Sequence, residues 1–180
     1  MFKNDVAGVL LSEEQLQKRV KELGEQITRD YSSEDCLIAV GILRGSVVFL
    51  ADLIRNINLH TELEFMAVSS YGSSSKSSGV VKINKDLDVD ISGKNVIIIE
   101  DIIDSGITLN YLKEMLLKRN PKSLKICTLL NKPDRRKIDI KADYIGFDIP
   151  DEFVIGYGLD YASRYRNMPY VGILKREIYE

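Results

Sequence analysis

The amino-acid sequence predicts an α/β protein with a mainly parallel central sheet flanked by helices on both faces. Two observations predict this fold class. Apolar runs of strand length alternate with segments of helical period along most of the chain. Several of these runs are almost continuously apolar, which is typical of parallel strands that are covered on both sides. Strands interleaved with helices in this way favour right-handed crossovers.

The individual elements follow from local patterns. Ser12-Glu-Glu-Gln15 is a capping box, and apolar residues at helical spacing follow it, so the first helix is predicted to run from Ser12 to about Tyr31. Pro121 lies just beyond the end of a later helix. The remaining predicted elements are strand Leu37–Ile42, helix Val47–Ile57, strand Glu62–Val68, strand Asn95–Ile99, helix Leu109–Lys118, strand Ser123–Leu130 and strand Asp143–Phe147.

Two regions interrupt this alternation. Residues 69–83 begin with small polar residues, so we expect a mobile loop there, extended into a hairpin arm by Val80–Ile83. Residues 149–180 contain two prolines and many aromatic residues but no clean helical period. We expect them, together with residues 1–11, to form a small irregular hood that covers a ligand site.

Composition limits the class of protein. The 180 residues suffice for one domain with a substantial core, so a single domain over residues 1–180 is expected. With 25 basic and 27 acidic residues the net charge is −2, which argues against nucleic acid as a partner. Cys36 and Cys127 suggest neither a disulfide framework nor a zinc site. No apolar run approaches the length of a membrane span, so we expect a cytoplasmic protein without a membrane partner.

The most informative segment runs from Val96 to Thr108, where an apolar strand leads directly into acidic residues, hydroxyls and a glycine. Parallel sheets bind ligands at the carboxyl ends of their strands. The backbone N–H groups of the helix that begins after Asp104 lack intrahelical partners, so Ser105, Gly106 and Thr108 favour a phosphate there. The neighbouring acids indicate a polyhydroxyl sugar or a magnesium ion beside it.

Other phosphate-binding or hydrolytic classes fit less well. Gly41-Ile-Leu-Arg-Gly45 is not a dinucleotide fingerprint, and Gly93-Lys94 precedes a strand instead of following one, as a Walker loop would. The only histidine, His60, is expected at the end of a surface helix, which disfavours a serine hydrolase. A magnesium-dependent phosphatase stays open as a lower-ranked alternative.

Four segments together resemble a known family. Val96–Thr108 resembles the phosphoribosyl-pyrophosphate signature of the type I phosphoribosyltransferases. Gly41–Gly45, Leu130–Asp134 and Pro150–Tyr161 with Arg166 resemble its 6-oxopurine branch, the hypoxanthine-guanine phosphoribosyltransferases. The resemblance implies transfer of a 5-phosphoribosyl group from 5-phosphoribosyl 1-pyrophosphate to hypoxanthine or guanine, giving IMP or GMP and pyrophosphate in purine salvage. It also implies Mg²⁺ as cofactor and a homodimer or homotetramer.

The same resemblance implies roles for individual residues on the sugar-phosphate side. Glu100 and Asp101 would face the ribose hydroxyls and a magnesium ion, and Asp104 would be the catalytic residue beside purine N7. The 5′-phosphate would be held by Asp104, Ser105, Gly106, Ile107 and Thr108. Ile107 stands where many relatives carry a basic residue, so phosphate binding would depend on backbone and hydroxyl groups.

On the purine side, Lys132 would donate to purine O6 and Phe153 would stack on the base. Val154 would contact the edge of the base, and Asp160 would lie near it while holding a second magnesium ion. Arg166 would bind pyrophosphate.

Leu43-Arg44-Gly45 matches the loop that binds pyrophosphate, and we predict a cis peptide bond between Leu43 and Arg44. The family often has lysine at the position of Arg44, which keeps the charge but changes the geometry. Ser70 and Tyr71 would close over the site. A regulator that binds the same activated sugar without turnover is the competing class, but such proteins usually append a DNA-binding domain.

Overall fold

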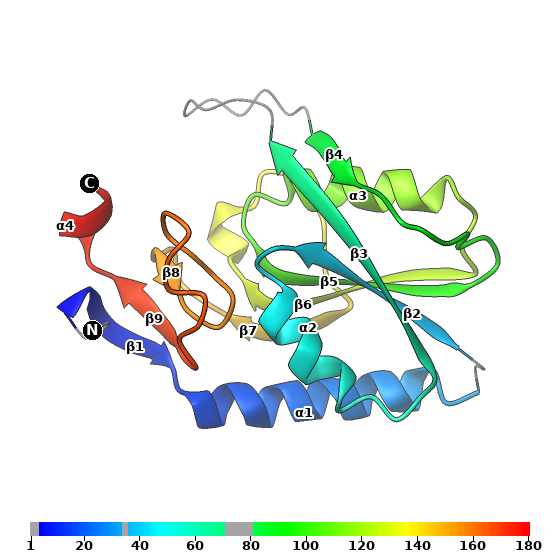
Figure 1. The fold of residues 1–180 in the computed structure, drawn as a ribbon, viewed down its shortest axis with the longest axis horizontal. Helices are drawn as coiled ribbons and strands as arrows, with labels where there is room; N and C mark the ends of the chain where they lie inside the picture. Colours follow the sequence, from blue (N-terminus) through cyan, green and yellow to red (C-terminus); the bar gives the residue numbers. More distant parts are fainter. Residues whose placement is uncertain (1–3, 34–35, 71–80) are drawn as a thin grey trace.

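The computed structural model describes residues 4–33, 36–70 and 81–180, which form a six-stranded and a three-stranded sheet (Figure 1). The order in the larger sheet is β4-β3-β2-β5-β6-β7, and in the smaller one β1-β9-β8. The elements are β1 (Val6–Leu11), α1 (Glu13–Asp30), β2 (Leu37–Leu43), α2 (Val47–Ile54), β3 (Thr61–Ser70), β4 (Val81–Lys85), β5 (Asn95–Ile103), α3 (Ile107–Leu117), β6 (Ser123–Asn131), the 3₁₀ turn Pro133–Arg135, β7 (Tyr144–Asp148), β8 (Val154–Ile155), β9 (Val171–Leu174) and α4 (Arg176–Tyr179).

The larger sheet is parallel except for β4, which pairs antiparallel with β3. Helices α1 and α2 pack on one face of it, in a cluster that includes Leu23 and Phe49. Helix α3 packs on the opposite face through Leu112 and Leu116. The predicted α/β fold with helices on both faces is therefore confirmed, and β5 lies inside the sheet between β2 and β6.

Helix α1 begins as predicted. The Ser12 side chain accepts a hydrogen bond from the Gln15 backbone N–H at 3.3 Å, and the Gln15 side chain accepts one from the Ser12 N–H at 2.8 Å. These bonds satisfy two of the N–H groups that a helix start leaves free. Leu16, Val20 and Ile27 of this helix are completely buried.

Several element boundaries differ from the predicted ones. Helix α2 ends at Ile54, three residues early, so exposed His60 lies in the connection to β3 and not at a helix end. Strand β5 continues to Ile103 and therefore includes both acidic residues that were expected after the strand. Pairing of Glu100 with Thr128 and of Ile102 with Leu130 on β6 extends the ladder through the acids.

The hood is more regular than the sequence suggested. Strand β9 lies between β1 and β8 in an antiparallel sheet, which joins the amino-terminal and carboxyl-terminal segments beside the larger sheet (Figure 1). Ile155, Tyr165, Met168 and Leu174 form its small apolar core. Strands of two and four residues are too short to give a recognisable period, which is why they were missed.

The predicted hairpin arm is present in part, since β4 begins at Val81 and pairs with β3. Tyr71 and the rest of the predicted mobile segment up to residue 80 lie outside the described residues. Among the residues that are described, no helix is both long enough and apolar enough to cross a membrane.

Candidate active site

The two acidic residues of β5 occupy a poorly solvated position at its carboxyl end. Glu100 Oε2 is covered and has no hydrogen-bond partner among the described residues. Burial, and repulsion from the adjacent Asp101 carboxylate, raise the pKa of Glu100 well above its usual range. Burial also raises the pKa of Asp101 to about 6, although a 2.7 Å hydrogen bond from Ile102 N–H and the charge of Arg166 oppose this shift. Both carboxyl groups thus favour binding of a cation or of hydroxyl donors.

The chain turns sharply between β5 and α3. Gly106 caps α3 with φ of 81°, and a Cβ there would lie 2.6 Å from Ile140 Cγ2, so only glycine fits. Ser105 Oγ accepts a hydrogen bond from Ile107 N–H at 3.4 Å. A pocket of about 170 Å³ lies at this helix start and is lined by Glu100, Ile102, Ile103, Asp104, Ser105, Gly106, Thr108 and Leu109. Four of the five residues predicted to hold the 5′-phosphate line this pocket, Ile107 being the exception, and phosphate binding there stays a prediction.

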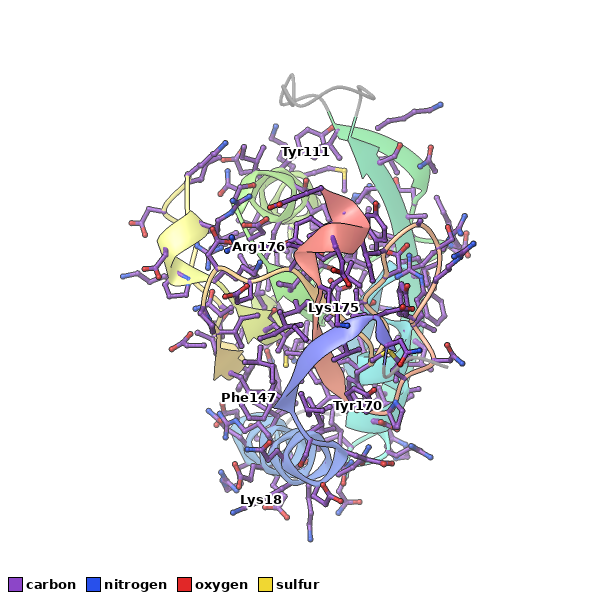
Figure 2. The ribbon with its side chains drawn as sticks, turned by 90° about the vertical axis from the view of Figure 1, so that its left-hand side faces the viewer. Lys18, Tyr111, Phe147, Tyr170, Lys175 and Arg176 are labelled. Atoms are coloured by element: carbon purple, nitrogen blue, oxygen red, sulfur yellow. The ribbon has the colours of Figure 1, made fainter. Side chains whose placement is uncertain are left out.

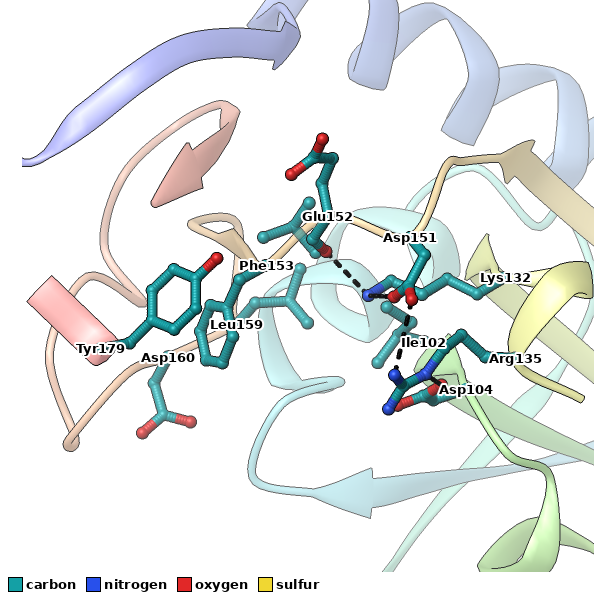
Figure 3. A pocket seen from close by; sticks show the side chains of 11 residues that line it. Ile102, Asp104, Lys132, Arg135, Asp151, Glu152, Phe153, Leu159, Asp160 and Tyr179 are labelled. Carbon is teal, nitrogen blue, oxygen red and sulfur yellow. Dashed lines mark hydrogen bonds and ion pairs between the residues drawn. The ribbon is translucent and has the colours of Figure 1, made fainter. Parts of the chain in front are cut away.

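A larger cavity of about 420 Å³ lies between the central sheet and the hood (Figure 3). It brings together five predicted site residues: Asp104, Lys132, Phe153, Val154 and Asp160. Six further residues were not predicted: Ile102, Arg135, Asp151, Glu152, Leu159 and Tyr179. Ile102 and Asp104 line both pockets, so the two pockets meet at the turn after β5.

Lys132 is held firmly at one wall of this cavity. Its Nζ donates a 2.7 Å hydrogen bond to the Glu152 carbonyl oxygen and lies 3.6 Å from Asp151 Oδ1. The residue is only 8% exposed. A buried ammonium aimed into a cavity offers a donor to a ligand, whereas a lysine on an open surface would be solvated.

Asp104 lies on the same side of the cavity as Lys132 (Figure 3), and two arginines contact it. Arg135 Nε lies 3.0 Å from Asp104 Oδ1 and Arg135 Nη1 lies 3.4 Å from Asp151 Oδ2, while Arg136 donates to the Asp104 carbonyl oxygen at 2.7 Å. The sequence signal for these arginines was their position directly after the Lys132 segment. That signal alone does not distinguish them from solvated charges.

The loop Leu43–Gly45 contains the predicted cis peptide bond between Leu43 and Arg44, and the Arg44 side chain is exposed. Close packing surrounds this loop. A Cβ on Gly45 would lie 1.5 Å from Asp101 Oδ2. A Cβ on Gly158, whose φ is +103°, would lie 2.1 Å from the Gly45 carbonyl oxygen. Only glycine at both positions lets the hood loop, the Leu43–Gly45 loop and β5 approach so closely.

Arg166 connects the hood loop to the same region. It donates to the Gly158 carbonyl oxygen at 2.6 Å and forms a 2.7 Å ion pair with Asp160 Oδ1. Its charge also acts on the buried Asp101 carboxyl. The structure therefore brings Arg166, Asp160 and Asp101 together around Gly45.

Two predicted residues cannot be placed in this way. Tyr71 lies outside the described residues. Ser70 is the last residue of β3, and its backbone pairs with Val81. The predicted closure of residues 70 and 71 over the site stays a prediction.

The acidic residues suit a magnesium ion. Glu100 presents a buried carboxylate oxygen that accepts no hydrogen bond within the described part of the chain, and Asp101 lies directly beside it in sequence. Mg²⁺ prefers such oxygen ligands and in enzymes is held by one or two carboxylates together with substrate oxygens and water. The donors present therefore fit an ion that is shared between the protein and a phosphorylated substrate.

Comparisons with known proteins agree with this geometry. The fold and the pocket after β5 define the class of phosphoribosyltransferases, and the model of the phosphoribosyl transferase domain matches residues 8–162. The hypoxanthine-guanine phosphoribosyltransferase of Bacillus subtilis is 57% identical over 180 residues, which cover 100% of this chain and 99% of that protein. That of Streptococcus agalactiae is 53% identical, with 99% of each chain covered.

Solved structures give the same relationship. A hypoxanthine phosphoribosyltransferase from Staphylococcus aureus superimposes with a TM-score of 0.94 at 53% identity, covering 98% of this chain and 96% of that one. A hypoxanthine-guanine phosphoribosyltransferase from Bacillus anthracis gives a TM-score of 0.91 at 51% identity, covering 95% and 100%. The chain belongs to the hypoxanthine-guanine phosphoribosyltransferase family.

Proposed function

We propose that this protein transfers the 5-phosphoribosyl group from 5-phosphoribosyl 1-pyrophosphate to hypoxanthine or guanine, forming IMP or GMP and pyrophosphate. The observation that carries the proposal is the junction of the two pockets at Ile102 and Asp104. A phosphate at the start of α3 and a base beside Lys132 would then flank one point, where the new glycosidic bond forms. Positioning of two reactants in this way converts a bimolecular step into an effectively unimolecular one.

Each group of residues around the forming glycosidic bond would have its own role. Backbone N–H groups from Ser105 to Thr108 bind the 5′-phosphate, and Glu100 and Asp101 orient the ribose through its hydroxyls. Asp104 accepts the N7 proton of the base as the bond to the sugar forms. The Leu43–Gly45 loop and Arg166 hold the departing pyrophosphate.

Mg²⁺ is part of this proposal, with Glu100 and Asp101 near one ion and Asp160 near a second. When bound, the ion neutralises developing charge on pyrophosphate. The buried Glu100 oxygen, for which the described residues supply no hydrogen-bond partner, supports the first of these sites.

Lys132 would select the base. An ammonium donates to the 6-oxo group of hypoxanthine or guanine but meets another donor in the 6-amino group of adenine. The hydrogen bond to the Glu152 carbonyl fixes the ammonium in the wall, so it cannot turn away easily. A buried donor without an acceptor costs about 1–3 kcal/mol, which supports discrimination against adenine. Phe153 would stack on the base, and Val154 and Asp160 would contact its edge.

We further propose that the chain acts as a single domain in the cytoplasm, assembled as a homodimer or homotetramer, with Ser70 and Tyr71 closing over the site during turnover. Multi-angle light scattering on purified protein would give the oligomeric state.

The central experiment incubates the protein with Mg²⁺, 5-phosphoribosyl 1-pyrophosphate and one base at a time, with chromatographic detection of the nucleotide. Hypoxanthine and guanine should give IMP and GMP, and adenine should give little product. Adenine turnover comparable to that of hypoxanthine would contradict the assignment of the base. Saturable binding of the activated sugar without product from any base would instead indicate a regulator.

A further inference from the structure

Two aromatic side chains contact the Phe153 ring, and one of them, Tyr179, lies outside the sequence motifs. The ring of Tyr179 stacks on it with a centroid separation of 4.8 Å and an interplanar angle of 24°. The Tyr161 ring lies perpendicular to the Phe153 ring, with a centroid separation of 5.6 Å and an interplanar angle of 88°. Phe153 still keeps 37% of its surface exposed. Tyr179 therefore covers one face of the Phe153 ring, and part of the ring stays exposed at the cavity that it lines.

The open side of Phe153 points toward the proposed base site. Figure 3 shows Phe153 between Tyr179 on one side and Lys132, Ile102 and Asp104 on the other. Tyr179 thus lies behind the ring, away from the side where a base would meet Lys132. This arrangement backs the Phe153 ring without filling the space in front of it.

Hydrogen bonds of the hood fix this arrangement. The Leu174 N–H at the end of β9 donates to the Phe153 carbonyl oxygen at 2.8 Å, and the Lys175 N–H donates to the Asp5 carbonyl oxygen at 3.0 Å. Figure 2, which faces the hood, shows Lys175 beside β1 at the point where the chain enters α4. Ile178 and Tyr179 pack on the apolar core of the hood. Helix α4 is therefore anchored to the segment that carries Phe153.

We propose that Tyr179 is a positioning residue for the purine, which holds Phe153 so that Tyr179, Phe153 and the base form one three-layer stack. The inference rests on the proposed function and names the element that completes its base site. An unsupported Phe153 ring could rotate away, so each binding event would include the cost of ordering it. With Tyr179 behind it, the ring is already placed before the base arrives.

The first test compares Tyr179→Ala with Tyr179→Phe and with Arg176→Ala, a control on the same helix. Loss of an aromatic pair is worth a fold-change of roughly 3- to 10-fold, so Tyr179→Ala should raise the KM for hypoxanthine by that factor. The KM for 5-phosphoribosyl 1-pyrophosphate and kcat should change little, because the sugar-phosphate pocket is not touched. Tyr179→Phe keeps the ring and should behave like the wild type, as should Arg176→Ala.

The second test does not depend on activity. The chain contains no tryptophan, so Tyr179→Trp introduces a single indole reporter against Phe153. Its emission should change in a saturable way when IMP is added and stay constant with pyrophosphate alone. Thermal unfolding of all variants shows whether the hood is intact. If Tyr179→Ala does not fold, the fluorescence of Tyr179→Trp decides whether residue 179 responds to binding at the base site.

The results separate the two levels of the proposal. Wild-type turnover of hypoxanthine together with an unchanged KM in Tyr179→Ala would overturn the role of Tyr179 but leave the proposed function in place. A lowered KM in Tyr179→Ala would also overturn it, because the tyrosine would then obstruct the base. Failure of the wild type to use any 6-oxopurine would overturn both.

Discussion

Replacing Gly45 by alanine places a methyl group where the Asp101 carboxylate now lies. The new Cβ would be 1.5 Å from Oδ2 and 2.5 Å from Cγ of Asp101, whereas ordinary contacts begin at 3.4 Å. The φ of Gly45 is not positive, so alanine is allowed by the backbone and its effect comes from this contact alone. The carboxylate or the Leu43–Gly45 loop must therefore shift by about 1.9 Å.

If the Asp101 carboxylate moves by this distance, it loses its hydrogen bond to the backbone of its own strand. Asp101 Oδ1 accepts from Ile102 N–H at 2.7 Å, and this distance cannot be kept if the carboxylate moves away. An interaction with a charged group contributes about 1.5–3 kcal/mol, which corresponds to about 10- to 150-fold in an equilibrium constant. We expect Gly45→Ala to lower kcat/KM for 5-phosphoribosyl 1-pyrophosphate by a factor in this range.

The assay is steady-state turnover at saturating hypoxanthine, with the activated sugar varied. Gly8→Ala is the matched control, because a Cβ on Gly8 meets nothing within 4 Å. Thermal unfolding of both variants separates a local displacement from loss of the fold. The reasoning fails if Gly45→Ala is folded and its kcat/KM stays within about twofold of that of Gly8→Ala.

Three further predictions concern the acids and the lysine. Asp104→Asn keeps the shape but removes the proton acceptor, so kcat should fall by about 10²- to 10⁴-fold with little change in the unfolding temperature. Lys132→Met should lower kcat/KM for hypoxanthine by about 10- to 150-fold. The ratio of kcat/KM for hypoxanthine to that for adenine, measured on the same variant, should therefore fall. Burial raises the pKa of Asp101 from 3.8 to about 6, so between these pH values the folded ligand-free protein binds a proton that the unfolded chain releases. Stability is then lost as the pH rises through this window, and Asp101→Asn should raise the Tm at pH 7.5 more than at pH 4 in differential scanning fluorimetry.

Each of these has a clear contrary outcome. Unchanged kcat in Asp104→Asn would remove this residue from proton transfer. An unaltered ratio of hypoxanthine to adenine turnover in Lys132→Met would show that a group other than Lys132 selects the base. An equal change of Tm at both pH values would show that the Asp101 proton is not linked to folding.

The sequence was informative wherever function depends on adjacent residues. The acids, the hydroxyls and Gly106 lie within nine residues of one strand–helix junction, and their types alone indicate a phosphate beside a sugar or a metal. Lys132 is different, because among neighbouring lysines it looks like a solvated charge. Its burial behind the Glu152 carbonyl comes from the approach of the hood and is not visible locally.

Features that depend on distant residues could not be predicted from one sequence. The requirement for glycine at Gly45 comes from Asp101 and that at Gly158 comes from Gly45, so each is explained only after the chain has folded. Tyr179 belongs to no motif, and in the sequence alone Arg135 cannot be distinguished from an ordinary surface arginine. In each of these cases a long-range contact, and not a local propensity, decides the role.

The pairing of β1 with β9 has a consequence for the order in which the site can form. Val6 pairs with Leu174, so β1 cannot complete its pairing until β9, far along the chain, has been synthesised. Domains fold progressively during synthesis, and contacts between distant residues form late. The sugar-phosphate half of the site, carried by β5 and α3, can therefore be assembled in a nascent chain that still has no wall for the base.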